Sequence, residues 1–352
     1  MMKNNNATPR RDFLKNMALA TGTGFFLSSF QGNPSKKQKE IIVGHGDFTY
    51  KVDKNWGNQD PGKYPVNHCH EMVQDSKKRL ILLTNHIQNN ILIYDKSGKI
   101  TQNWTLKLPA AHGLTLSQEG NEEFLFITDT DLHQVYKTTM QGKVLLTIDY
   151  PKEIKTYEKA DDFKPTEVAV APNGDFYVAD GYGKNFIIQY SPKGEYIRHF
   201  GGKGDSKDQF DCCHGVTLDM RKPENPSLLI TSRSKQEFKR FTLDGKHLET
   251  ISLPGCWICR PVIKGKYLYF AVIVTVSWYD YDGMVVILDE NNRVISLPGG
   301  SAPVYEGGAL QKPVYDGLTF LNPHDVCVDD EENLYVPQWY SGKTYPVKLK
   351  RI

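Results

Sequence analysis

The stretch "PTEVAVAPNGDFYVADGYGKNFIIQYSPKGEYIRHF", residues 165–200, decides the fold. It contains four short segments of apolar or alternating residues, and turns rich in Gly, Asn, Asp and Pro separate each segment from the next. This pattern is typical of antiparallel strands joined by tight turns. Four such strands in about 40 residues have the size of one blade of a β-propeller.

The same unit recurs along the chain, and the stretch at 165–200 resembles an NHL repeat. Further copies begin near residues 69, 111, 213, 259 and 323. We therefore predict an all-β fold, a six-bladed β-propeller over residues 41–352. The last copy has only three strands, whereas "DFTYKVDKNW" at 47–56 is a strand pattern without a partner. We expect this N-terminal strand to close the last blade, which removes two exposed sheet edges.

The N-terminus resembles a targeting segment. The sequence "TPRRDFLKNMALATGTGFFLSSF" at 8–30 has paired arginines followed by a mild apolar stretch, as in a twin-arginine export signal. An ordinary amphipathic helix is the alternative. We assign residues 1–30 to the signal and 31–40 to a polar linker, and we expect a periplasmic or extracellular location.

The composition excludes several classes of protein. The 352 residues include 43 basic and 41 acidic ones, and this balance argues against a protein that coats nucleic acid or a membrane surface. No apolar run reaches the roughly 18 residues that a membrane span needs. An exported location permits disulfides among the six cysteines, whose pairing stays open, as does the oligomeric state.

Histidines recur at the start of the first strand of several units. Aligning the six copies places one residue of each at an equivalent position: His70, His112, Thr166, His214, Arg260 and His324. The first strand of a blade lines the central channel, so these residues should meet at one mouth of it. Three of the histidines, His112, His214 and His324, come from alternate blades and should converge as the ligands of an open three-histidine metal site. His70 is a possible fourth ligand, a replacement for one of the three, or a polar wall.

The connections between second and third strands should lie at the same mouth. In the third copy this connection presents Tyr182, and in the fourth it presents Arg233. The long connections between blades, at 151–164, 202–211 and 299–320, exceed the usual loop length and predict a walled binding pocket.

Four motifs together resemble one enzyme family. They are "HGLTL" followed by "EFLFITDTDLHQVYK", "FKPTEVAVAPNGDFYVADGY", "FDCCHGVTLD" and "NPHDVCVDDEENLYV". In their order they are similar to the lyase domain of peptide-amidating enzymes, peptidyl-α-hydroxyglycine α-amidating lyase. The resemblance covers roughly residues 70–350.

The resemblance implies a six-bladed propeller with a catalytic zinc and a structural calcium. The implied zinc ligands are His112, His214 and His324. Tyr182 would be the base and Arg233 a substrate-binding arginine. The calcium would be bound by Asp325 and by the backbone carbonyl groups of Met72 and Leu114.

The sequence also departs from the family. Asn85 and His86 stand in a loop where the family has an arginine, Asn322 stands in place of a methionine, and Gly183 replaces a disulfide-forming cysteine. His70 is additional. We expect Asn85, His86 and Asn322 to line the pocket with Thr166 and Arg260, and their identities leave the substrate open.

These residues predict a metal-dependent lyase that acts on a small molecule or peptide with a carboxylate. The metal would lower the pKa of a bound hydroxyl, Tyr182 would take up a proton if nearby cations depress its own pKa, and Arg233, together with Arg260, would bind the carboxylate. In the family this chemistry splits a hydroxyglycine-extended peptide into an amide and glyoxylate.

Two alternatives stay open. The chain could be a non-catalytic exported propeller that binds a peptide, a glycan or a protein partner, with Tyr182, Arg233 and Asp325 in structural roles. It could also be a lactonase-type hydrolase centred on calcium. The six equivalent positions contain no carboxylate, which argues against the second alternative.

Overall fold

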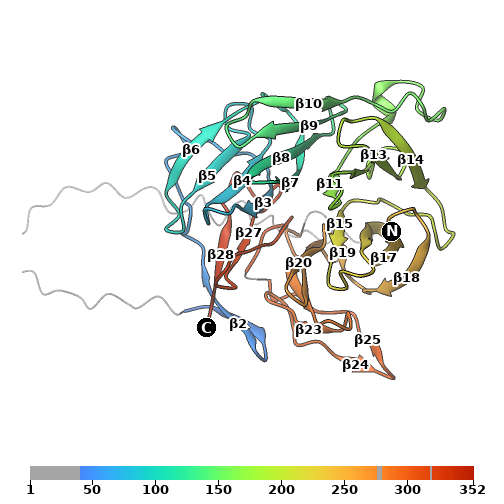
Figure 1. The fold of residues 1–352 in the computed structure, drawn as a ribbon. Coiled ribbons are helices and arrows are strands. Elements are labelled where there is room, and N and C mark those ends of the chain that lie inside the picture. Colours follow the sequence, from blue (N-terminus) through green and yellow to red (C-terminus); the bar gives the residue numbers. More distant parts are fainter. Residues whose placement is uncertain (1–39, 276–279, 318) are drawn as a thin grey trace, which may run out of the picture. The chain divides into compact units, whose positions relative to one another are not determined.

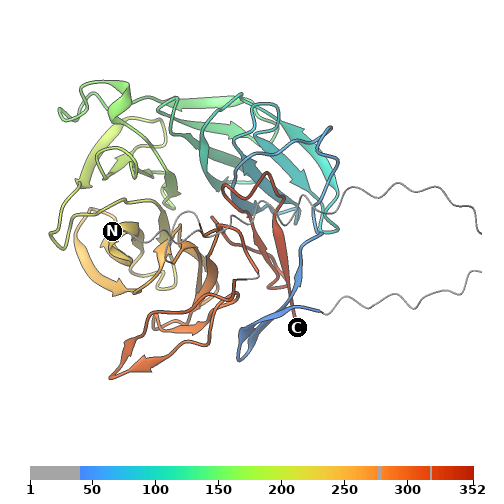
Figure 2. The same ribbon diagram turned by 180° about the vertical axis from the view of Figure 1, so that it is seen from behind.

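The computed structural model describes residues 40–275, 280–317 and 319–352. Six β-sheets form a ring in which the first strands of neighbouring blades lie side by side around the channel (Figures 1 and 2). Within the described residues the helical elements are the short 3₁₀ turns η2 (Ala160–Asp162) and η3 (Arg233–Lys235). The predicted all-β, six-bladed propeller is confirmed. The predicted signal and nearly all of the linker lie outside the described residues.

The first three blades have four strands each and follow the expected repeat. From the channel outward they are β3 (Cys69–Gln74), β4 (Leu80–Thr84), β5 (Ile91–Tyr94) and β6 (Ile100–Trp104); β7 (Ala111–Glu119), β8 (Glu122–Asp129), β9 (Gln134–Thr139) and β10 (Val144–Ile148); and β11 (Glu167–Val170), β12 (Phe176–Ala179), β13 (Phe186–Tyr190) and β14 (Tyr196–Gly201). All neighbours within these sheets are antiparallel.

Of the other three blades, blade 4 keeps this plan and blades 5 and 6 vary it. They are β15 (Val216–Asp219), β16 (Ser227–Ser232), β17 (Glu237–Thr242) and β18 (His247–Ser252); β19 (Trp257–Ile258) with β20 (Val262–Lys264), then β21 (Tyr267–Val274), β22 (Met284–Leu288) and β23 (Val294–Ser296); and β26 (Cys327–Val328), β27 (Leu334–Val336), β28 (Val347–Arg351), β2 (Phe48–Asp53) and β1 (Ile42–His45). A small hairpin of β24 (Tyr305–Glu306) and β25 (Ala309–Leu310) lies in the long connection between blades 5 and 6.

The N-terminal strand closes the ring. β2 pairs antiparallel with β28, so that Tyr50 faces Arg351 and Asp53 faces Lys348 (Figure 1). The expectation from residues 47–56 is therefore confirmed, and β1 adds a fifth strand to this blade.

Burial follows the position of a strand within its blade. The inner strands β4 and β5 are buried at every residue, because both faces of each sheet are covered by neighbouring blades. The outer strand β6 is largely exposed. Apolar clusters bridge adjacent blades, as where Ile81 and Ile93 pack with Leu114 and Ile127. This packing fixes the angular position of each blade, and therefore of each first strand.

The cysteines are all free thiols, and five of the six are buried. Among the described residues no helix is long and apolar enough to cross a membrane.

Ring closure by β2 should contribute strongly to stability. Tyr50 on β2 is fully buried and packs in the cluster shared by blades 5 and 6. We expect Tyr50→Ala to lower the free energy of unfolding by about 3 kcal/mol, because it leaves a cavity at the closure. Tyr50→Phe keeps the ring and should cost less than about 1 kcal/mol. Denaturant unfolding of both variants checks this, and equal effects of the two substitutions would contradict it.

Candidate metal centre

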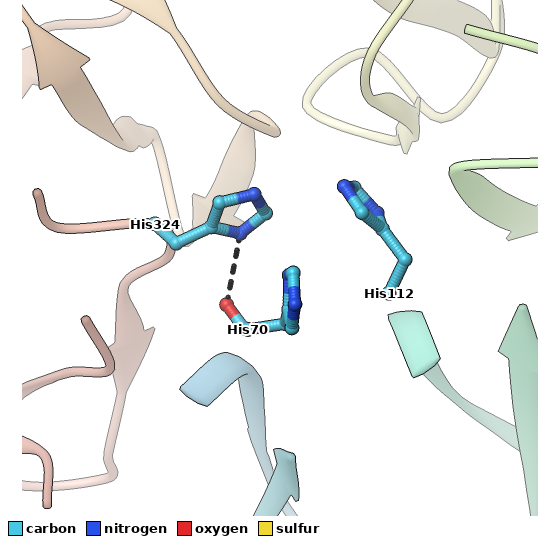
Figure 3. Close-up of side chains that lie close together, drawn as sticks. All are labelled: His70, His112 and His324. Carbon is cyan, nitrogen blue, oxygen red and sulfur yellow. Dashed lines mark hydrogen bonds between the residues drawn. The ribbon is translucent and has the colours of Figure 1, made fainter. Parts of the chain in front are cut away.

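Four imidazoles converge at one mouth of the channel. We call His70, His112, His214 and His324 the histidine cluster; Figure 3 shows three of its members. The ring centroid of His112 lies 4.9 Å from that of His70, 4.7 Å from that of His214 and 5.0 Å from that of His324. All four side chains are buried. The structure therefore brings together the three histidines of the alternate blades and adds His70 to them.

Backbone contacts orient two of these rings. Nδ1 of His112 lies 2.9 Å from the carbonyl oxygen of Thr166, and Nδ1 of His324 lies 3.0 Å from that of His70 (Figure 3). An Nδ1–H that donates to a carbonyl group leaves the Nε2 lone pair free, which is the usual arrangement of metal-binding histidines. Thr166 thus acts through its backbone rather than as a pocket side chain.

The donor set fits a metal ion such as Zn²⁺. Ligand atoms of His70, His112 and His324 lie within 4.8 Å of one another, and Nε2 of His112 lies 3.1 Å from Nε2 of His214. Nδ1 of His70 and Nδ1 of His214 are buried without a hydrogen-bond partner. Two nitrogens bound to one tetrahedral zinc lie about 3.3 Å apart, since each Zn–N bond is about 2.0 Å.

Burial keeps the histidine cluster neutral. It lowers the pKa of His112 to about 3, an effect that the nearby Arg233 reinforces. Burial, with Arg233 and the neighbouring imidazoles, also holds the pKa values of His70, His214 and His324 well below the ordinary value. Neutral imidazole is the form that binds metals.

Tyr182 and Arg233 lie against the histidine cluster. The Tyr182 hydroxyl is 3.1 Å from Nε2 of His112 and accepts a hydrogen bond of 3.3 Å from Arg233. Arg233 is buried, and its Nε donates to the carbonyl oxygen of Ile258 at 2.9 Å. The loops after the second strands of blades 3 and 4 therefore bring a phenol and a guanidinium to the predicted place.

The expectation that nearby cations depress the pKa of Tyr182 is corrected by the structure. Although 42% of this residue is exposed, its hydroxyl lies deep among His112 and Arg233. Burial of the hydroxyl raises the pKa of Tyr182 to about 12, and Arg233 opposes this only in part. The protein alone thus keeps the phenol protonated at neutral pH.

Asp180 holds the loop that presents Tyr182. Its carboxylate accepts hydrogen bonds from the Tyr157 hydroxyl at 2.5 Å and from the backbone N–H groups of Lys164 and Lys184 at 2.7 and 2.5 Å. A Cβ on Gly183 would lie 2.2 Å from this carboxylate. Glycine is therefore required at position 183, which corresponds to the disulfide-forming cysteine of the family named above.

Three members of the histidine cluster, His70, His112 and His324, line a cavity of about 460 Å³. The cavity is lined by His68, His70, Asn85, Ala110, His112, Thr130, Tyr182, Cys212, Arg233, Ser234, Trp257, Ile273, His324 and Trp339. Asn85 lies where we expected it. We did not expect Trp257 and Trp339 in the pocket. The only feature of the sequence that could have indicated them is that each is a large aromatic residue close to a blade boundary.

Two other expected pocket residues do not line this cavity. His86 turns back on its own loop, where its Nδ1 accepts from the N–H of Gln88 at 3.3 Å. Asn322 is fully buried with its backbone in the left-handed region, at φ 51°. These placements correct the expectation that both side chains face the substrate.

Arg260 and the expected calcium site also need correction. The Arg260 side chain enters the channel and not the cavity, and it binds Asp325 and the carbonyl oxygens of Met72 and Leu114. These are the oxygen atoms that we expected around calcium. A guanidinium fills their centre, so the residues present do not fit a calcium ion there.

The sequence of the chain is similar to that of several known proteins. No family model matches the chain. It is 28% identical over 263 residues to peptidyl-glycine α-amidating monooxygenase A of Xenopus laevis, covering 71% of this chain and 26% of the relative. It is 38% identical over 119 residues to peptidyl-α-hydroxyglycine α-amidating lyase 1 of Drosophila melanogaster, covering 33% and 21%. The chain thus spans about a quarter of the length of these relatives.

Solved structures show the same fold at low identity. A streptogramin B lyase superposes with a TM-score of 0.54 at 14% identity, covering 82% of this chain and 95% of that chain. The virginiamycin B lyase of Staphylococcus aureus gives the same score and identity over 89% and 100%. The chain is a six-bladed β-propeller with sequence similarity to peptidylglycine α-amidating enzymes.

Proposed function

We propose that this chain is a metal-dependent lyase that cleaves a carbon–nitrogen bond in a peptide or small molecule bearing a carboxylate. The observation that carries the proposal is the neutral histidine cluster with the Tyr182 hydroxyl and the Arg233 guanidinium in contact beside it. Similarity to an α-hydroxyglycine amidating lyase supports the reaction type.

The metal would be Zn²⁺, held by His112, His214 and His324, with His70 beside them. When bound, a zinc ion supplies Lewis acidity that lowers the pKa of a coordinated hydroxyl. Three neutral imidazoles leave a position open for substrate, whereas a fourth ligand would close the site. Although ligand atoms of His70, His112 and His324 lie within 4.8 Å of one another, His70 comes from the blade between those of the other two. We therefore assign His214, from an alternate blade, to the metal and His70 to the wall of the site.

The chain's own residues would bind the substrate and move one proton. Arg233 provides a buried positive charge for the substrate carboxylate. With its pKa lowered by a bound cation, the Tyr182 oxygen would receive the proton of the substrate hydroxyl and pass it to the departing amide nitrogen. The hydroxyl carbon becomes the aldehyde of glyoxylate as its bond to nitrogen breaks, so atoms and charge balance without any other reactant.

The upper part of the cavity suits an apolar substrate group. Trp257, Ile273 and Trp339 contribute large apolar surfaces to its lining. Such walls would bind an apolar side chain and exclude water from Tyr182 and Arg233. We therefore expect substrates with an apolar residue before the hydroxyglycine.

Removal of the Tyr182 hydroxyl should abolish the reaction and spare the metal. We expect Tyr182→Phe to reduce glyoxylate release from α-hydroxyhippurate by at least about 100-fold, because no group then transfers the proton. Tyr177→Phe removes a hydroxyl that donates to Leu243 away from the site and should leave the rate unchanged. Full activity of Tyr182→Phe, or a wild-type protein that releases no glyoxylate, would favour the non-catalytic binding module.

Metal content should identify the ligands. We expect wild-type protein to carry about one zinc per chain after dialysis and His214→Ala to carry almost none, because each ligand contributes a large share of the affinity. His70→Ala should retain zinc, as should the surface control His247→Ala. Elemental analysis of the purified proteins measures this. If His214→Ala retained zinc and His70→Ala lost it, His70 would be the ligand and His214 part of the wall.

The metal-free protein should lose stability as the pH falls below about 6.5. Imidazoles of the unfolded chain bind protons there, whereas the buried histidine cluster does not. Asp180 and Glu71 act in the opposite direction, because burial raises their pKa values. Because the four histidines outnumber the two carboxyl groups, the unfolded chain should bind more protons in this range, and the free energy of unfolding should fall as the pH falls. Denaturant unfolding in EDTA across this range tests it, and a flat profile would contradict it.

A further inference from the structure

The guanidinium of Arg260 lies in the channel among oxygen atoms of Met72, Leu114, Asp325, Glu71 and Glu167, which we call the cage. The Arg260 guanidinium donates to both carboxylate oxygens of Asp325 at 2.8 Å. It also donates to the carbonyl oxygens of Leu114 at 2.8 Å and Met72 at 3.0 Å. Neither carbonyl group belongs to a residue near Arg260 in the sequence, so this contact joins three separate parts of the ring.

Two further carboxyl groups approach the same guanidinium. The nearest oxygen of Glu71 lies 3.1 Å from Arg260 Nη1, and that of Glu167 lies 3.6 Å from it. Both glutamates and Asp325 are at most 1% exposed. The cage therefore collects residues from blades 1, 2, 3 and 6 around a side chain of blade 5.

The cage requires a positive charge. Three buried carboxyl groups without a counter-charge would be strongly destabilising. Burial alone would lower the pKa of Arg260, but Asp325, Glu71 and Glu167 hold it well above its ordinary value. The guanidinium is thus permanently charged, and its planar fork can reach several acceptors at once.

Blade 4 makes room for the arginine. A Cβ on Gly215 would lie 2.5 Å from the Cα of Arg260, so that only glycine allows this close approach. The first strand of blade 5 is also split, into β19 and β20, on either side of Arg260. Gly215 and the break between β19 and β20 therefore mark the backbone position from which Arg260 extends.

We propose that Arg260 is a tethered internal cation that takes the place of a divalent metal, and that removing it turns the cage into a calcium site. Ca²⁺ prefers six to eight oxygen ligands, including carboxylates and backbone carbonyls, and tolerates irregular geometry. The two oxygens of Asp325, the two carbonyls and the glutamates offer such a set. The wild-type ring accordingly folds without calcium. This proposal does not depend on the lyase activity.

The test compares melting temperatures of the full chain in EGTA and in excess calcium chloride. Wild-type protein should melt within about 1 °C in the two buffers. Arg260→Ala should melt well below wild type in EGTA, and calcium should raise its melting temperature by about 5 °C or more, because the ion binds only the folded state. Isothermal titration of the variant with calcium should show one site, absent from wild type.

Two controls make the result specific to the cage. Arg240→Ala removes a half-buried arginine that binds Asp219 at 2.5 Å and should be destabilised without any response to calcium. Adding Asp325→Asn to Arg260→Ala should abolish the calcium response. If Arg260→Ala does not fold in EGTA, refolding yield with and without calcium replaces melting, and refolding only with calcium supports the proposal. Calcium stabilisation of wild type, or a variant that calcium neither stabilises nor refolds, would overturn it.

Discussion

Charge buried in the channel needs a partner of opposite sign, and Arg260 supplies the positive charge that faces Asp325, Glu71 and Glu167. The residues of this contact are sequence neighbours of the metal centre: Glu71 follows His70, and Asp325 follows His324. We call the histidine cluster the upper layer, and Arg260 with Glu71, Glu167 and Asp325 the lower layer. The salt bridge that holds the lower layer also fixes the backbone that carries the upper one.

The groups that would act on a substrate beside the histidine cluster come from loops and not from first strands. Tyr182 and Arg233 come from loops after second strands, and each loop is fixed by buried contacts outside the cavity. Asp180 gathers three donors beneath the Tyr182 loop, and the carbonyl oxygen of Ile258 holds the Arg233 side chain. Because these anchors are buried, the phenol and the guanidinium meet the imidazoles in a defined geometry. The scaffold therefore positions both reactive groups.

The repeat register was enough to predict the convergence of the imidazoles, because equivalent positions in a closed ring must face one axis. The same reasoning failed for Arg260, which shares that register. Its strand is split into β19 and β20, and its guanidinium binds Asp325 and Glu71 in the lower layer. Neither feature has a periodic signature. Trp257 and Trp339 were missed because an aromatic residue at a blade boundary resembles ordinary core, and the raised pKa of Tyr182 depends on burial that a sequence does not reveal.

The two layers also interact electrostatically. Three carboxyl groups face one guanidinium in the lower layer, and burial raises the pKa of Glu71. Acidic groups therefore outnumber basic ones beneath the neutral imidazoles. Such an excess of acidic groups favours a cation in the histidine cluster. A divalent ion there would in turn oppose the burial that holds the pKa of Tyr182 near 12, so the same cation that the lower layer attracts would prepare the phenol for proton transfer.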